Sequence, residues 1–205
     1  MLRKRLFARL YPGLSARHEA LVKERKEALF ARALAKTLPG RVLEVGPGPG
    51  VNLAYLPPGL VYLVLEPNPF YPLLEAAARE RGVHLTLVPG SAEAIPLPEA
   101  SVDLVVGTLV LCSVREPGRA VAEVRRVLRP GGVYLFVEHV AAPPSTPSRL
   151  LQGMATPLFS LLGDGCHPNR DPLPFLLEAF ARVEVERLDL PLPVVGPHLM
   201  GLAWA

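Results

Sequence analysis

Three closely spaced glycines follow the first short apolar run of this sequence, and their spacing indicates a ligand-binding turn. Gly46, Gly48 and Gly50 come directly after the run 41–45. Glycines at such a place permit a tight turn and let a ligand approach the backbone closely. A dinucleotide-binding loop would place its third glycine at position 51, where this chain has valine. A phosphate-binding P-loop would continue with Lys-Ser/Thr, which is also missing from the sequence here.

The charges around this turn favour a cationic ligand. The loop carries no basic residue, and Glu44 precedes it. This arrangement suits a ligand with a positive amino group, such as S-adenosylmethionine, better than a pyrophosphate. A glycine turn that only shapes the fold is the alternative.

A second acidic residue, Glu66, stands at the end of the next apolar run, about 20 residues beyond the glycines. An acid in this position accepts hydrogen bonds from both hydroxyls of a ribose. Many strands also end in an acid before a turn, so Glu66 alone is weak support. Together with the glycine loop it predicts a nucleoside ligand.

Four further side chains could act on a second substrate. His139 follows an apolar run and is our first candidate for a base, with a purely structural histidine as the alternative. Asp164 lies in a glycine-rich turn that could cover the substrate, or it only serves that turn. Cys112 and Cys166 are more typical of small buried apolar residues than of catalysts.

The elements that must position these residues alternate between strand and helix. Such alternation predicts βαβ units and a parallel, doubly wound α/β sheet. A helix over 15–37 ends at Pro39, and a turn at 129–132 closes the helix 116–128. Strands are expected at 41–45, 60–65, 83–88, 102–106, 133–137, 182–189 and 198–204, and the other helices at 70–81, 146–162 and 172–181.

Composition excludes several classes of protein. The net charge of +3 is concentrated in the first ten residues, so no nucleic-acid surface is indicated. Two cysteines make no disulfide framework, and neither lies in a C-x-x-C zinc pattern, so no metal site is expected. No run is long and apolar enough to span a membrane or to direct export, so we expect a cytoplasmic protein. The basic N-terminus allows at most peripheral contact with a membrane. Many arginines and few amides agree with a thermostable protein.

Four spaced motifs together resemble the class I S-adenosylmethionine-dependent methyltransferases. They are residues 42–50, Glu66, residues 101–106 and residues 128–132. The resemblance implies a Rossmann-like, seven-stranded, mostly parallel sheet with an antiparallel C-terminal strand pair. It also implies one domain over 1–205, with a helical lid (1–40), a cofactor-binding half (41–140) and substrate-side helices with the C-terminal hairpin (141–205).

The same resemblance assigns the cofactor S-adenosyl-L-methionine to particular residues. Glu44 and the three glycines would hold its methionine end, and Glu66, Pro67 and Asn68 its ribose. Ser91 stands where the family usually has the aspartate that contacts adenine, so that contact would pass to the backbone or to Ala92. Gly107, Thr108 and Cys112 complete the expected cofactor site.

The segments 107–114, 136–142 and 164–166 resemble a narrower branch, the membrane-associated thiol S-methyltransferases. This implies a small-molecule acceptor, an alkyl thiol, with His139 and Asp164 as candidate catalytic residues. Methylation of an amine, a lipid head group or a phenol is the alternative within enzymes. A regulator that binds the cofactor without catalysis is the alternative outside them, and a nicotinamide oxidoreductase is disfavoured by the glycine spacing. The acceptor's identity and the oligomeric state stay open.

Overall fold

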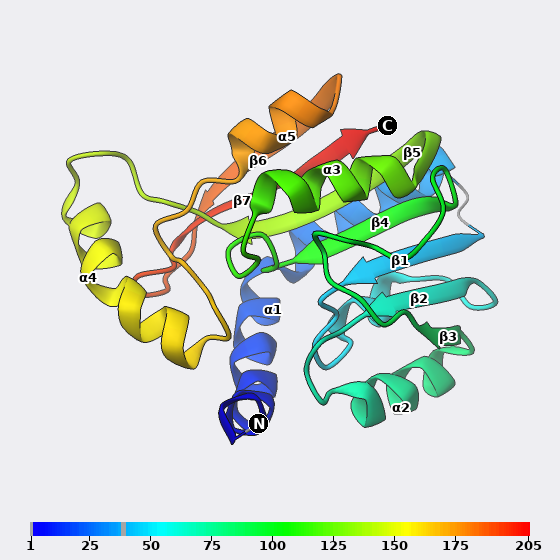
Figure 1. The fold of residues 1–205 in the computed structure, drawn as a ribbon, viewed down its shortest axis with the longest axis horizontal. Coiled ribbons are helices and arrows are strands. Elements are labelled where there is room, and N and C mark those ends of the chain that lie inside the picture. The colour runs from blue at the N-terminus through cyan, green and yellow to red at the C-terminus, as the bar shows by residue number, and fades with distance from the viewer. Residues whose placement is uncertain (1, 38–39) are drawn as a thin grey trace.

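A computed structural model describes residues 2–37 and 40–205, and it is built on one seven-stranded sheet (Figure 1). The strand order is β3-β2-β1-β4-β5-β7-β6. The first five strands of this order are parallel, and β7 runs antiparallel to both of its neighbours. The expected sheet with its antiparallel C-terminal pair is therefore confirmed. The strands are β1 (Arg41–Val45), β2 (Val61–Leu65), β3 (His84–Leu87), β4 (Val102–Thr108), β5 (Leu128–His139), β6 (Arg182–Asp189) and β7 (Pro197–Trp204).

Helices cover both faces of the sheet because successive strand residues point to opposite sides. Val42 and Leu104 face α1 (Leu2–Thr37), α2 (Tyr71–Arg81) and the short 3-10 helix η1 (Val51–Tyr55). Leu43 and Val105 face α3 (Pro117–Val127) and α5 (Leu173–Ala179). The result is a three-layer structure in which the strands are buried on both sides, as their continuous apolar runs require.

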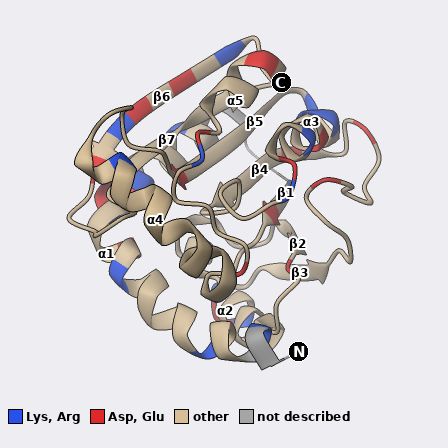
Figure 2. Ribbon diagram, turned by 60° about the vertical axis from the view of Figure 1, so that its left-hand side comes forward, with Lys and Arg blue, Asp and Glu red and all other residues tan. Residues whose placement is uncertain are grey.

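One helix, α4 (Pro147–Leu162), lies apart from these layers, beyond the ends of β5 and β7 (Figure 1). Its buried Gln152 fixes it to the body: Nε2 donates to the carbonyls of Val140 and Val194, each at 3.0 Å, and Oε1 accepts from the N–H of Ala142 at 2.8 Å. Figure 2 shows that α4 carries little charge. In the part of the chain that the structure describes, no helix is long and apolar enough to cross a membrane.

Two expectations about the elements are wrong. The N-terminal helix begins at Leu2 rather than near residue 15, and Pro12 lies inside it. Proline costs one backbone hydrogen bond there, but Phe7 and Tyr11 pack on the rest of the protein and hold the first turns in place. The expected turn at 129–132 is instead the irregular start of β5, where the pairing register with β4 shifts. The expected helix end at Pro39 lies outside the described residues.

Candidate active site

A cavity of about 370 Å³ lies at the carboxyl ends of β1, β2, β4 and β5, roofed by α1 and the segment after α4. This is where ligands bind in open α/β sheets, and the volume is in the range of small-molecule sites. The predicted site residues that border it are Gly46, Gly48, Glu66, Pro67, Asn68, Ser91, Ala92, Cys112, His139 and Asp164. Those that do not border it are Glu44, Gly50, Gly107 and Thr108.

Glu44 supports the glycine loop from beneath and does not face the cavity, in contrast to its expected role at the methionine end. Its carboxylate is fully buried and accepts hydrogen bonds from the amide of Asn52, at 2.7 Å, and from the hydroxyl of Tyr62. The same amide of Asn52 donates to Thr108 Oγ1 at 3.0 Å. Glu44 and Thr108 therefore tie the helix after the glycine loop to β1 and β4. Burial raises the pKa of Glu44 to about 7.

The glycine loop has the backbone conformation that its residues predict. Gly46 and Gly48 have φ values of +62° and +57°, in the left-handed region that side chains disfavour. A Cβ on Gly48 would lie 3.0 Å from the ring of Tyr11, and a Cβ on Gly46 would lie 3.0 Å from Val110. Tyr11 and Val110 therefore pack directly on the backbone of this loop, and the cavity borders the same backbone.

Glu66 stands at the expected place and holds the two cofactor loops together. One carboxylate oxygen accepts the N–H of Gly48 and the other accepts the N–H of Asn68, both at 2.8 Å. Burial raises the pKa of Glu66. Each oxygen keeps a lone pair beyond these backbone bonds, so the side chain can still accept from a ribose diol in the cavity.

The N-terminal half of α1 closes the cavity over these loops. Phe7 and Tyr11 pack against each other and against Phe70, with ring centroids 4.8 to 6.1 Å apart. Lys4 Nζ donates to the carbonyl of Pro67 at 3.1 Å. The sequence predicts a lid over 1–40, but these aromatic side chains are not among the predicted site residues. The spacing of four residues between Phe7 and Tyr11 is a signal that could have placed both on one helix face.

The loop after β4 forms the opposite wall and is fixed from below by Glu138. One oxygen of this buried carboxylate accepts the N–H groups of Val110 and Leu111, at 2.9 and 3.0 Å. Leu109, just before them, has a φ of +57°, which is strained for a leucine. The strain directs Leu109 and Val110 toward the cavity.

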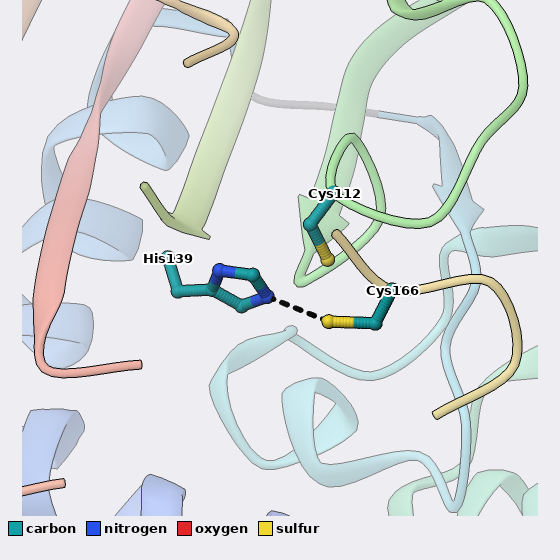
Figure 3. Close-up of side chains that lie close together, drawn as sticks. All are labelled: Cys112, His139 and Cys166. Carbon is teal, nitrogen blue, oxygen red and sulfur yellow. Dashed lines mark hydrogen bonds between the residues drawn. The ribbon is translucent and has the colours of Figure 1, made fainter. Parts of the chain in front are cut away.

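Three reactive side chains from distant parts of the chain meet in this wall (Figure 3). Cys112 comes from the loop after β4, His139 from the end of β5 and Cys166 from the segment after α4. His139 Nε2 lies 3.1 Å from Cys166 Sγ, and the reactive atoms of all three residues lie within 4.8 Å of one another. The hydrogen bond with Cys166 and burial raise the pKa of the Cys112 thiol well above its ordinary value. The sequence had predicted Cys112 as part of the cofactor site and both cysteines as more typical of small buried apolar residues than of catalysts, and the meeting of the three side chains was not predicted.

Asp164 bridges the two halves of the cavity. Its Oδ2 accepts the side-chain amide of Asn68 at 2.8 Å, so the segment after α4 is tied to the loop after β2. Asp164 itself has a φ of +52°. This contact gives Asp164 a positioning role across the cavity mouth.

The geometry agrees with comparisons to known proteins. Residues 43–136 match the model of a methyltransferase domain family. The chain is 37% identical over 211 residues to the human thiol S-methyltransferase TMT1B, covering 98% of this chain and 86% of that protein. It is 38% identical to human thiol S-methyltransferase TMT1A, covering 79% and 69% respectively. This chain belongs to the class I S-adenosylmethionine-dependent methyltransferases.

A solved methyltransferase shares the fold. The SAM-dependent methyltransferase of Thermotoga maritima superposes with a TM-score of 0.62 at 19% identity, over 98% of this chain and 99% of that one. The methyltransferase takes its methyl group from S-adenosyl-L-methionine, and its cavity fits that donor. The cavity reaches the backbone at Gly46 and Gly48, and the carboxylate of Glu66 borders it as an acceptor for ribose hydroxyls.

Proposed function

We propose that this methyltransferase transfers the methyl group to a small lipophilic acceptor, an alkyl thiol. The observation that carries the proposal is the match to thiol S-methyltransferases along almost the whole chain. The chemistry of the cavity supports it. Leu109, Val110, Phe159 and Val195 line the cavity, and these four side chains offer no charge to a carboxylate or phosphate acceptor.

The protein's part in such a transfer is chiefly positioning. S-adenosylmethionine supplies an activated methyl group when bound, so the protein must align the acceptor, exclude water and keep the nucleophile in its reactive form. The lid residues Phe7 and Tyr11 exclude water from above. A thiol must also lose its proton, because the thiolate is the nucleophile. We propose that His139 takes part in this activation, since it borders the apolar wall, and that Asp164 positions the segment opposite.

The donor site is proposed to bind the cofactor as the family resemblance implies. Glu66 with Pro67 and Asn68 would hold the ribose, and the backbone at Gly46 and Gly48 the methionine end. Ser91 and Ala92 border the same cavity and would hold the adenine. Glu44 would act only through the loop that it supports.

A matched panel of acceptors tests the function. Labelled S-adenosylmethionine is incubated with hexanethiol, hexylamine and hexanol, which share one chain length and differ only in the nucleophile, and separately with a phenol. We expect label on the thiol, appearing as a thioether. Methylation of the amine or phenol without the thiol would replace the thiol assignment with N- or O-methylation. Absence of any transfer, alongside cofactor binding, would favour a regulator.

We also propose that the N-terminal half of α1 contacts membranes peripherally. Leu6, Leu10 and Leu14 are half or more exposed and lie beside Arg9, a combination that suits an anionic interface. Cosedimentation with anionic but not zwitterionic vesicles is expected, and Arg9→Glu should weaken it. Equal recovery with both vesicle types would contradict this contact.

A further inference from the structure

Cys112, His139 and Cys166 form a trio of side chains, and methyl transfer by positioning alone does not require such a cluster of two thiols and an imidazole. Two thiols and an imidazole are soft and borderline donors, the set that proteins use for zinc. All three residues also border the cavity, so a ligand bound by them would be reached by the acceptor. Side chains that only fill space in the core need not place their polar atoms close together.

The distances are close to those of a metal site. Zinc with bonds of about 2.1–2.3 Å in tetrahedral geometry sets its ligand atoms about 3.5–3.8 Å apart. The three donor atoms lie within 4.8 Å of one another, and His139 Nε2 lies 3.1 Å from Cys166 Sγ. Shifts of about 1 Å or less at the side chains would bring them to the tetrahedral spacing.

The backbone around the trio is fixed by hydrogen bonds that do not involve the donor atoms. The N–H of His167 donates to the carbonyl of Cys112 at 2.9 Å, which joins the two cysteine-bearing segments. Arg170 Nη1 donates to the carbonyls of Leu111, Cys112 and Val114 at 2.6 to 3.2 Å. The N–H of Ala141, two residues after His139, donates to the carbonyl of Arg170 at 2.9 Å. The backbone of each donor residue is thus held in one shared frame.

We infer that Cys112, His139 and Cys166 bind one Zn²⁺ ion, and that its fourth position faces the cavity and takes the sulfur of the acceptor thiol. Three protein ligands with one open position are the arrangement of catalytic rather than structural zinc. The inference rests on the proposed thiol acceptor and specifies how His139 would contribute, as a metal ligand.

Methyl transfer to the zinc-bound acceptor sulfur requires no reactant besides the thiol and S-adenosylmethionine. The acceptor thiol releases its proton to solvent as its sulfur becomes the fourth ligand, because zinc lowers the pKa of a bound thiol. A lone pair of that sulfur forms the bond to the methyl carbon, and the bond between this carbon and the sulfonium sulfur breaks. Its electron pair stays on the sulfonium sulfur, giving S-adenosylhomocysteine. The methylated product is a neutral thioether, a weak ligand for zinc, so it leaves.

Cobalt(II) provides a test with a readout other than turnover. Reduced, chelator-treated protein is titrated with Co²⁺, whose visible and near-ultraviolet bands report tetrahedral geometry and thiolate ligation. We expect one ion per chain with thiolate charge-transfer bands. Cys112→Ser and Cys166→Ser should each reduce those bands and weaken binding at least about tenfold, and His139→Ala should also weaken binding. His139→Cys should keep a tetrahedral site, although it removes the imidazole.

The acceptor completes the test. Addition of hexanethiol should shift the cobalt bands, and hexanol should not. Unchanged cobalt binding in the Cys112→Ser/Cys166→Ser double variant, or full thiol methylation by protein shown to contain no metal, would overturn the zinc site and leave the thiol activity standing. Cobalt binding that needs the trio, with methylation only of amines, would instead overturn the proposed function and its acceptor at the fourth position.

Discussion

The Nε2 atoms of His18 and His198 lie 3.1 Å apart in a buried contact between α1 and β7. The Nδ1 of His198 lies 2.9 Å from the carbonyl of Gly196 and therefore carries that ring's proton. Its Nε2 is then an acceptor, and His18 donates. Both rings are neutral in this arrangement, and protonation of both would place N–H against N–H, so the lid helix is attached to the sheet by a contact that protons can break.

Acid should therefore loosen the lid helix. Burial, followed by the neighbouring imidazole, lowers the pKa of His18 to about 3. Burial also lowers the pKa of His198 to about 4. The nearby His139 lowers this pKa as well, whereas Asp189 raises it. Both histidines bind protons more readily in the unfolded chain than in the folded protein. The free energy of unfolding therefore keeps their full contribution above about pH 6.5 and loses it as the pH falls toward about 4. Each histidine lowers the free energy of unfolding by at most about 1.4 kcal/mol per pH unit.

Chemical denaturation between pH 7 and 4.5 measures this effect. His18→Gln should flatten the fall in the free energy of unfolding by removing one titrating group, because the amide can still donate to His198. The exposed His84 provides the matched control, and His84→Gln should leave the slope unchanged. Identical slopes for the protein with and without His18 would show that other groups govern its acid stability.

Cofactor affinity should depend on Glu66. Its replacement by alanine removes the acceptors for the ribose and also frees the N–H groups of Gly48 and Asn68. We expect S-adenosylhomocysteine to bind about ten- to a hundredfold more weakly, with the fold retained. Calorimetry measures the affinity and circular dichroism the fold. Unchanged affinity would mean that the ribose is held elsewhere.

Gly48 should tolerate no side chain. Gly48→Val places a Cβ against Tyr11 and forces a branched residue to a positive φ. We expect loss of cofactor binding with a smaller loss of stability. Gly13→Ala is the control, since a Cβ there meets nothing within 4 Å, and it should bind normally and unfold at slightly higher temperature. Normal binding by Gly48→Val would exclude the loop as the cofactor cradle.

Removal of His139 should slow thiol methylation most at neutral pH. His139→Ala deprives the acceptor of activation, but solvent supplies the thiolate as the pH approaches the thiol pKa of about 8.5 or higher. The ratio of wild-type to variant kcat/KM should therefore fall between pH 7 and 9.5. A ratio independent of pH would indicate that His139 only supports the structure, and His84→Ala should give a ratio near one throughout.

The sheet and the cofactor loops could be predicted because their signals are local. The glycines after β1 and the acid after β2 sit within about one βαβ unit of each other. The trio could not be predicted, since Cys112 and Cys166 are separated by 54 positions and meet only when α4 folds back. Similarly, the start of α1 at Leu2 could not be predicted, because its first turns depend on tertiary contacts of Phe7 and Tyr11.

Glu44 shows a different limit. Its residue type and its position before the glycines predicted a connection with the glycine loop, but they did not predict the direction of its side chain. Strand residues alternate between faces, and the side chain at position 44 points into the layer under α1, where Tyr62 and Asn52 receive it. The side chain of Glu44 therefore does not border the cavity as expected, because the sequence predicts that strand residues alternate between the two faces of the sheet but not which face a ligand occupies.

The attachment of α4 through Gln152 has an evolutionary consequence. Glu66 and the glycine loop lie at β1 and β2, whereas α4 and the segment after it supply Phe159, Asp164 and Cys166 to the same cavity. Since the buried amide of Gln152 makes three hydrogen bonds that join α4 to the body, this segment can diverge or be exchanged while the glycine loop and Glu66 stay in place. Descendants of such a scaffold could acquire new acceptors by remodelling a single helix and its following loop.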